Sequence, residues 1–264
     1  MAEGVSTEID KLKSMNKLLI VGLVIFSFFL GSLTNKLATL KSGTAENPSQ
    51  QTAVPQQATT ITIDKIKALF DGKNLTLGDK NSKNLFVEIS DPSCPYCSIA
   101  SGQNPELNKQ AGDQFLTAAD GGTYVPAVPE IKKLVDQGKA AFVYIYYPGH
   151  GSGELGAKAL SCANEKGKFW EVHDKLMSDS GYNLLNNTIK NDLTKSQELA
   201  DFLADVFDSA AMKSCLDSGK YDTRIAENTA TANTLGINGT PGFIINTSIF
   251  TGAYSWKDME SAVK

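Results

Sequence analysis

The order of apolar segments between residues 84 and 147 most strongly limits the folds open to this chain. NLFVEIS at 84–90 and AAFVYIYY at 140–147 are short apolar runs bounded by turn residues, as in buried strands. Between them, VPEIKKLVDQ at 128–137 has apolar side chains at helical spacing and is followed by Gly138. A strand, a helix and a strand in this order predict a parallel βαβ unit with a right-handed crossover.

The residues after this unit are predicted to be helical up to 235 and then to form a hairpin. Their patterns indicate helices at 154–177, 196–207, 212–216 and 221–235, strands at 242–246 and 248–251, and a final helix at 255–263. Ser255 suits the N-cap of that last helix. Residues 61–70 fit either a short helix or an opening strand. The folded part, 61–264, is therefore predicted to be α/β, with a helical insertion at about 150–235.

Residues 18–35, LLIVGLVIFSFFLGSLTN, form a run of eighteen uncharged residues. As a helix this run would be ~27 Å long, close to the ~30 Å hydrocarbon core of a bilayer. Three lysines precede the run and two follow it, which favours a cytoplasmic N-terminus at 1–17. We therefore expect a single-pass signal-anchor. The alternative is a cleaved signal peptide, for which SLT at 32–34 is a poor cleavage site.

Residues 36–60 are predicted to be a flexible linker. From 42 onward they are mainly Ser, Thr, Gln, Ala and Pro, which bury too little apolar surface to offset the entropy of ordering. The domain at 61–264 is accordingly expected at the cell membrane, on its extracytoplasmic side. A net charge of −4, with no cluster of Lys and Arg, argues against nucleic acid as the main partner.

The motif Cys94-Pro95-Tyr96-Cys97 directly follows the first predicted strand. A helix is expected to begin at Cys94, where free N–H groups and the helix dipole favour thiolate over thiol. Pro95 suits the first helical turn because it has no N–H to lose. The two-residue spacing lets Cys97 come round one turn and close a disulfide. We therefore predict a redox-active Cys94–Cys97 pair.

The alternative for this motif is half of a zinc site, which needs a second pair of ligands. Cys162 and Cys215 are 53 residues apart, and the two histidines, His150 and His173, do not form a ligand pair. No metal is therefore expected, and both histidines are interpreted as structural.

Two further features could serve a thiol pair. Glu88 lies six residues before Cys94 in an apolar strand, where burying an acid is costly without a purpose. It could accept and return the proton of Cys97, or it could be an ordinary surface acid. Pro241 stands at the entrance to a predicted strand and cannot donate to its ladder. A cis bond after Thr240 would place that residue against the active cysteine, although a plain turn is the alternative.

With these features, residues from about 77 to 264 resemble the DsbA-like family of thioredoxin-fold disulfide oxidoreductases, in particular its membrane-anchored branch. The resemblance lies in EISDPSCPYC at 88–97, in 146–177, in 215–246 and in FTGAYSWKDMESAVK at 250–264. It implies a thioredoxin fold with an inserted helical subdomain. It also implies Cys94 as nucleophile, Cys97 as resolving thiol, Glu88 as buried acid and Thr240-Pro241 as the cis-proline loop, with no cofactor. Tyr96 departs from the pattern, since many members carry histidine there.

The resemblance implies an oxidase that introduces disulfides into exported cysteine-containing proteins. A membrane quinone-linked thiol oxidase would then recycle it. One alternative is a disulfide reductase or isomerase that uses the same cysteine pair. Another, from a different class, is a non-catalytic thioredoxin-like scaffold or metal carrier.

Two parts of the chain lie outside the motifs described above. Cys162 and Cys215 fall in the helical insertion, and we expect a structural disulfide between them. Two free thiols or a second redox relay are the alternatives. Residues 101–127 form a longer segment than expected after the active helix, and the sequence assigns them no function.

Overall fold

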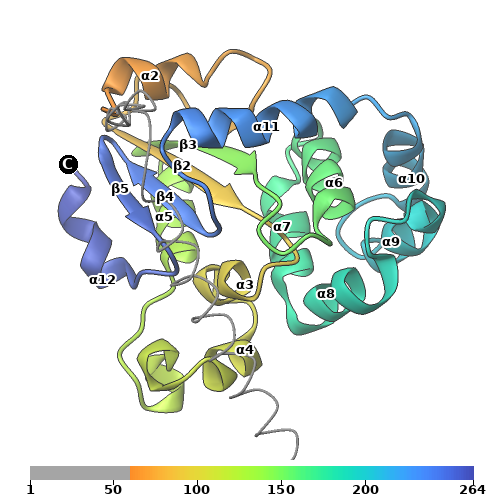
Figure 1. The fold of residues 1–264 in the computed structure, drawn as a ribbon, viewed down its shortest axis with the longest axis horizontal. Helices are drawn as coiled ribbons and strands as arrows, with labels where there is room; N and C mark the ends of the chain where they lie inside the picture. The colour runs from red at the N-terminus through yellow and green to blue at the C-terminus, as the bar shows by residue number, and fades with distance from the viewer. Residues whose placement is uncertain (1–59) are drawn as a thin grey trace, which may run out of the picture. The chain divides into compact units, whose positions relative to one another are not determined.

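The computed structural model describes residues 60–264, which form a mixed five-stranded sheet with helices packed around it (Figure 1). The segments predicted at 1–17 and 18–35, and all of 36–60 except its last residue, lie outside this range. Among the described residues, no helix combines the length and the apolar character needed to cross a membrane.

The sheet has the strand order β1-β3-β2-β4-β5. Its strands are β1 (Leu75–Leu77), β2 (Asn84–Ser90), β3 (Ala140–Tyr146), β4 (Gly242–Ile245) and β5 (Ser248–Thr251). β2 and β3 are parallel, and the other three neighbouring pairs are antiparallel. The predicted βαβ unit and the C-terminal hairpin are confirmed. β1 was not predicted, because three residues are too few to show a strand pattern.

Helices cover both faces of the sheet. On one face, residues such as Leu85 and Val87 pack against α2 (Ile63–Ala68) and the C-terminal part of α11 (Asp222–Thr234). On the other face, Phe86 and Tyr144 pack against α5 (Ala127–Asp136), α6 (Glu154–Asn164) and α7 (Phe169–Met177). α2 settles the choice left open for 61–70 in favour of a helix, capped by the Thr62 side chain.

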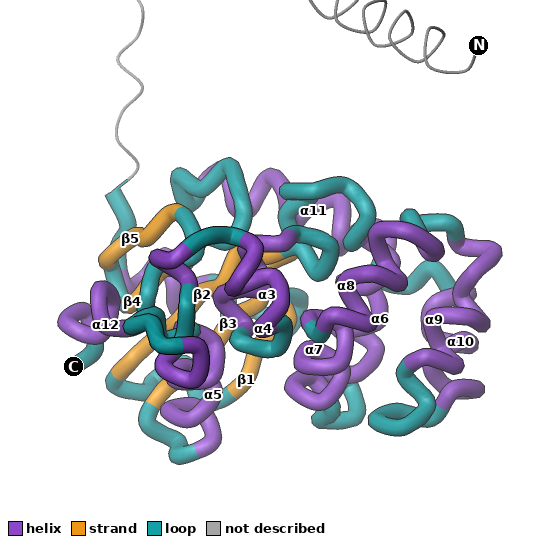
Figure 2. The backbone as a smooth tube through the Cα atoms, turned by 90° about the horizontal axis from the view of Figure 1, so that it is seen from below, coloured by secondary structure: helices purple, strands orange, loops and turns teal. Residues whose placement is uncertain are grey.

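Part of the helical insertion, including α9 (Ser196–Phe202) and α10 (Ser209–Asp217), lies beside the sheet, as Figures 1 and 2 show. Besides these two helices and α6, α7 and α11, the insertion contains α8 (Asp179–Asn183), a π-helical turn (Leu184–Ile189) and a 3-10 turn (Leu193–Lys195). The prediction of one helix over 154–177 is wrong. The chain breaks between α6 and α7, where Gly167 has a φ of 65°, a left-handed conformation that favours glycine.

Two shorter regions complete the described chain. After α3 (Pro95–Ser101), residues 102–126 form α4 (Pro105–Gln110) and two 3-10 turns, Asp113–Phe115 and Ala118–Asp120. The C-terminal helix is α12 (Trp256–Met259), extended by the 3-10 turn Glu260–Ala262. Ser255 takes the N-cap position but makes no capping bond. Its hydroxyl instead accepts the N–H of Val125 at 3.0 Å, which ties the segment after α3 to the C-terminal helix.

Candidate active site

Cys94 is the N-cap of α3, at the end of the short loop that follows β2. Pro95 takes the first helical position, as predicted. The Cys94 sulfur lies 3.6 Å from the Thr240 carbonyl oxygen. The Cys94 residue keeps 5% exposure, whereas Cys97 inside the helix is fully buried. Tyr96 between them is 47% exposed. Cys94 is therefore the cysteine nearer to solvent, although little of it is exposed.

The two thiols have opposite acidities. The Cys97 thiol donates a hydrogen bond to Cys94 and, together with the Thr240 side chain and the first backbone N–H groups of α3, lowers the pKa of Cys94 to about 6. Burial works against this shift. Burial is the main reason why the pKa of Cys97 is raised well above its ordinary value, and the neighbouring Cys94 adds to that rise. At neutral pH the reduced pair therefore carries its thiolate on Cys94.

Glu88 is fully buried in the middle of β2, opposite Tyr144 of β3 and Phe243 of β4. The alternative of a surface acid is wrong. Burial raises the pKa of the Glu88 carboxyl, and a positive charge on His173 works against that shift. Neither carboxyl oxygen has a hydrogen-bond partner among residues 60–264. A buried acid of this kind holds a proton more tightly than an exposed one and can exchange it with a neighbour.

The Thr240–Pro241 peptide bond is cis, and this loop leads directly into β4. Thr240 also lies against the loop after β3. A Cβ atom placed on Gly149 would be 1.9 Å from the Thr240 hydroxyl oxygen, so a larger residue there would force the Thr240 side chain to move. Thr240, Cys94 and the loop after β3 thus meet at one end of the sheet.

Asp91 organises this end of the sheet and was missed by the sequence analysis. Its carboxylate accepts the Ser93 N–H at 2.8 Å, the Ser93 hydroxyl at 2.7 Å and the His150 N–H at 2.8 Å. Its own N–H donates to the Cys97 sulfur at 3.5 Å. A Cβ on Gly153 would be 1.8 Å from the same carboxylate. Asp-Pro-Ser directly after a strand is a turn signal that could have drawn attention to it.

Aromatic and thioether side chains surround the two cysteines. Met177 of α7 packs against both, and its sulfur is 3.9 Å from the Ser98 hydroxyl. On the open side, the Tyr96 ring is 5.8 Å from that of Phe115, which is 5.4 Å from that of Tyr124. A shallow hollow of about 280 Å³ lies beyond them, lined by Phe115, Tyr124 and residues 252–255, among others. Residues 102–126, to which the sequence assigned no role, thus supply part of the surface beside the motif.

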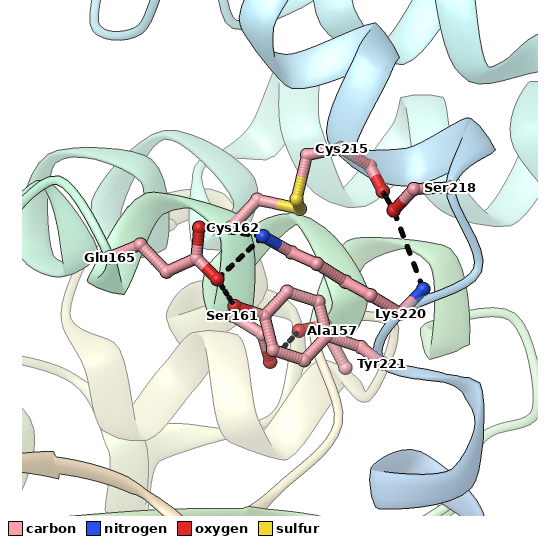
Figure 3. The surroundings of a disulfide bond; sticks show 8 residues. All are labelled: Ala157, Ser161, Cys162, Glu165, Cys215, Ser218, Lys220 and Tyr221. Carbon is pink, nitrogen blue, oxygen red and sulfur yellow. Dashed lines mark hydrogen bonds and ion pairs between the residues drawn. A yellow bond between two sulfur atoms is a disulfide. The ribbon is translucent and has the colours of Figure 1, made fainter.

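Cys162 of α6 and Cys215 of α10 form a disulfide, with Cα atoms 6.1 Å apart (Figure 3). Next to it Glu165 binds the Lys220 ammonium at 2.6 Å and the Tyr221 hydroxyl. These bonds fasten the chain between α10 and α11 to the end of α6. Within residues 60–264 no cluster of His, Cys, Asp and Glu could hold a metal ion.

Comparison with known proteins gives both sequence relatives and a matching family model. The model, described as Thioredoxin, matches residues 127–264, just over half of the chain. A Rickettsia felis protein provisionally named protein-disulfide oxidoreductase is 25% identical over 220 residues, which are 82% of this chain and 66% of that protein. Part of the Na(+)/H(+) antiporter NhaA 3 of Salinispora tropica is 26% identical over 204 residues. The chain spans 26% of the length of that antiporter.

Solved structures share the fold at low sequence identity. Oxidised BdbD from Bacillus subtilis superposes with a TM-score of 0.53 at 16% identity, covering 73% of this chain and 91% of that one. A variant of α-DsbA1 from Wolbachia pipientis gives a TM-score of 0.55 at 20% identity, covering 77% and 94%. The fold predicted for residues 61–264 is therefore confirmed, including its helical insertion.

Proposed function

Because the chain belongs to the thioredoxin family and has the fold of its DsbA-like members, we propose that it is a thiol–disulfide oxidoreductase acting through Cys94 and Cys97. The observation that carries the proposal is the asymmetry of the pair. Cys94 caps α3 with its pKa lowered to about 6, and Cys97 is buried beside it with its pKa raised. Such a pair offers one thiolate for exchange and keeps the second thiol for resolution.

The exchange begins from the Cys94–Cys97 disulfide. A substrate thiolate attacks the Cys94 sulfur, forms a mixed disulfide and releases Cys97 as a thiolate, which takes up one proton. A second substrate thiolate then attacks the substrate sulfur of the mixed disulfide and releases the Cys94 thiolate. The substrate leaves with a new disulfide, and the two electrons remain on the cysteine pair. Glu88, buried below the motif with a raised pKa, is the acid proposed to give Cys97 its proton.

The lowered pKa of Cys94 favours oxidation of substrates over their reduction. A stabilised thiolate makes the reduced form of the pair more stable, so the disulfide form more readily accepts electrons. Thr240 has the complementary role of positioning the substrate. Its carbonyl lies next to the Cys94 sulfur, and an extended substrate segment could pair with this backbone.

The setting of the reaction is part of the same proposal. The substrates are exported proteins that contain cysteines, and a quinone-linked thiol oxidase of the membrane restores the disulfide. The run at 18–35 holds the domain at the membrane on its extracytoplasmic side. Carbonate washing of membranes, with N-terminal sequencing, tests this placement. A soluble mature form that begins after residue 34 would contradict it.

The direction of electron flow is tested by equilibrating the protein with glutathione redox buffers and trapping free thiols with a mass-shifting alkylator. Peptide mapping separates the Cys94–Cys97 pair from Cys162–Cys215. For an oxidase, the pair should be mainly reduced at potentials of about −200 mV, where a thioredoxin-like reductant of about −270 mV would be oxidised. A pair that is still a disulfide at about −250 mV would favour the reductase alternative. A pair that never exchanges with glutathione would favour a non-catalytic scaffold.

A further inference from the structure

His173 of α7 is a buried titratable group for which the proposed exchange has no role so far. Its side chain is fully buried, and its Nδ1 lies 3.0 Å from the Asp174 carboxylate. Its other ring nitrogen, Nε2, is also buried and has no hydrogen-bond partner among residues 60–264. Leaving such a nitrogen unpaired is costly, so a group that exchanges hydrogen bonds or protons with it is expected nearby.

The packing of α7 brings His173 towards Glu88. Met177, one turn further along the same helix face, packs against both redox cysteines. Phe169, one turn earlier, lies with its ring 5.5 Å from the His173 ring and 5.6 Å from that of Tyr144. Tyr144 is the register partner of Glu88 in the sheet. The face of α7 that carries His173 therefore lies over the strand pair that carries Glu88.

Several polar atoms in this region share one property. They are buried and have no hydrogen-bond partner among the described residues: both carboxyl oxygens of Glu88, the hydroxyls of Ser90 and Tyr144, and Nε2 of His173. Ser90 lies two residues after Glu88 on β2, so both side chains point to the same side of the sheet. Several isolated polar atoms in one core region are far more costly than a connected set, which points to a network.

The charged and titratable groups of this network come from β2, β3, α3 and α7 and from the loop after β2. Ser90 of β2 acts on the pKa of Glu88, of Tyr144 in β3 and of Cys97 in α3. Asp91 adds a charge that acts on Tyr144. From α7, His173 and Asp174 act on Glu88 in opposite directions. The Asp174 side chain is 35% exposed, so the network reaches from the buried thiol to the surface.

We propose that His173 is a positioning residue that shares one proton with Glu88 and renews it from solvent beside Asp174. The inference rests on the proposed exchange reaction. When the Cys94–Cys97 disulfide is reduced, the electron pair of the broken bond leaves on the Cys97 sulfur, and Glu88 gives that thiolate the shared proton. Glu88 is then a carboxylate beside a neutral His173, and the ring takes one proton from solvent at its Asp174 side. Reoxidation returns one proton by the same route.

The protonation of His173 can be followed directly, because the chain contains only two histidines. Full-length protein labelled with 15N-histidine is titrated by NMR between pH 5 and 9, once reduced and once after chemical oxidation, with free thiols counted. His150→Gln assigns the signals and is the matched control, since that imidazole is exposed. The His173 titration should differ between the two redox states, and Glu88→Gln should abolish the difference. Identical titrations of His173 in both states would overturn the proposal.

A kinetic arm separates this role from a structural one. His173→Asn keeps an amide where Nδ1 meets Asp174 but removes Nε2, whereas His173→Gln places an amide near Nε2. Both variants should slow the attack of Cys97 on a mixed disulfide at Cys94, the step that reoxidation uses, at least about tenfold and flatten its pH profile. Alkylation of Cys94 should keep its pH profile. Resolution at the wild-type rate in His173→Asn would mean that only the Asp174 bond matters, which would also overturn the proposal.

Failure of the proposed function has a different signature. The NMR arm uses chemical oxidation, so a protein that catalyses no exchange on substrates would still show whether His173 responds to the redox state of the cysteines.

Discussion

Two cysteines three positions apart have opposite acid–base properties because one caps a helix and the other lies inside it. Cys94 meets the free N–H groups at the start of α3, and the Cys97 thiol donates to its sulfur. Cys97 has lost its contact with water, which disfavours its charged form. The division of labour between attacking and resolving thiol therefore follows from the local backbone and from burial.

Alkylation of the reduced protein should show one fast thiol with a midpoint near pH 6, because the pKa of Cys94 is lowered to about 6. The rate is measured with iodoacetamide across pH 4 to 9. Cys94→Ser should remove the fast phase. Cys97→Ala should move the midpoint upward, since it removes the Cys97 hydrogen bond, which is the largest cause of the shift. A midpoint at about 8.5, the value of a free cysteine, would contradict this account.

At this scale the sequence located the residues that lie near one another along the chain or belong to a recognisable motif. Glu88 lies in β2, Cys94 and Cys97 come directly after that strand, and Thr240 meets Cys94 in space. Asp91 was missed because its role depends on the loop 59 residues further on. His173 was interpreted as structural because the residues around it have the apolar spacing of an ordinary amphipathic helix. Only the packing of α7 shows that the helix face with His173 lies over the strand pair that carries Glu88.

At the scale of elements, periodicity predicted what is long or strongly patterned. β2 matches its prediction residue for residue, and β3, α5 and the terminal hairpin agree to within a residue or two. The errors have physical reasons. Apolar spacing continues across the break at Gly167, so α6 and α7 appeared as one helix. β1 is too short to have a pattern of its own and is held by pairing with β3. The short turns of residues 102–126 are held by tertiary contacts such as that of Val125 with Ser255.

The disulfide between α6 and α10 joins Cys162 and Cys215, which are 53 residues apart in the chain, and should stabilise the helical insertion. In the chain-entropy model, closing a loop of that length contributes about 4 kcal/mol. Replacing both cysteines with serine should lower the free energy of unfolding by up to that amount, measured in urea. The Glu165 contacts with Lys220 and Tyr221 offset only part of the loss.

The matched control is the wild-type protein with both disulfides reduced, compared with the double variant whose Cys94–Cys97 pair is also reduced. The two should unfold at a similar urea concentration. Cys94 should react with iodoacetamide at its usual rate in the double variant. An unchanged unfolding midpoint would mean that the insertion is held by packing alone.

At the scale of the whole molecule, the buried acid should set how stability depends on pH. The folded-state pKa of Glu88 is raised by burial, so between its unfolded value of about 4.3 and its folded value the native state holds one proton more than the unfolded state. Stability from this group is complete below about pH 4.3 and is lost as the pH rises through the folded pKa. The buried Glu88 therefore lowers the free energy of unfolding at the higher pH values, where the redox pair carries its thiolate.

Urea unfolding at a series of pH values tests this dependence of stability on Glu88. The oxidised protein is used because Cys94 and Cys97 do not titrate when they form a disulfide. Glu88→Gln should be more stable than wild type at pH 7 and equal to it near pH 4. The loss of stability with rising pH should become smaller in the variant. A wild-type protein whose stability rises between pH 5 and 7, with no difference in Glu88→Gln, would contradict the burial argument.

The position of β2 in the sheet has a consequence for the order in which the chain can fold. On one side it pairs with β3, about fifty residues later, and on the other with β4, where Phe86 meets Ile245. That second partner is synthesised only after the whole helical insertion. Contacts so distant in sequence close slowly, because chain entropy is lost before they form. Until the final hairpin arrives, one edge of β2 has no strand beside it, and the two thiols lack the loop that covers them. A chain whose synthesis stops before residue 240 should therefore carry reactive cysteines without the loop and the strand that complete the active site.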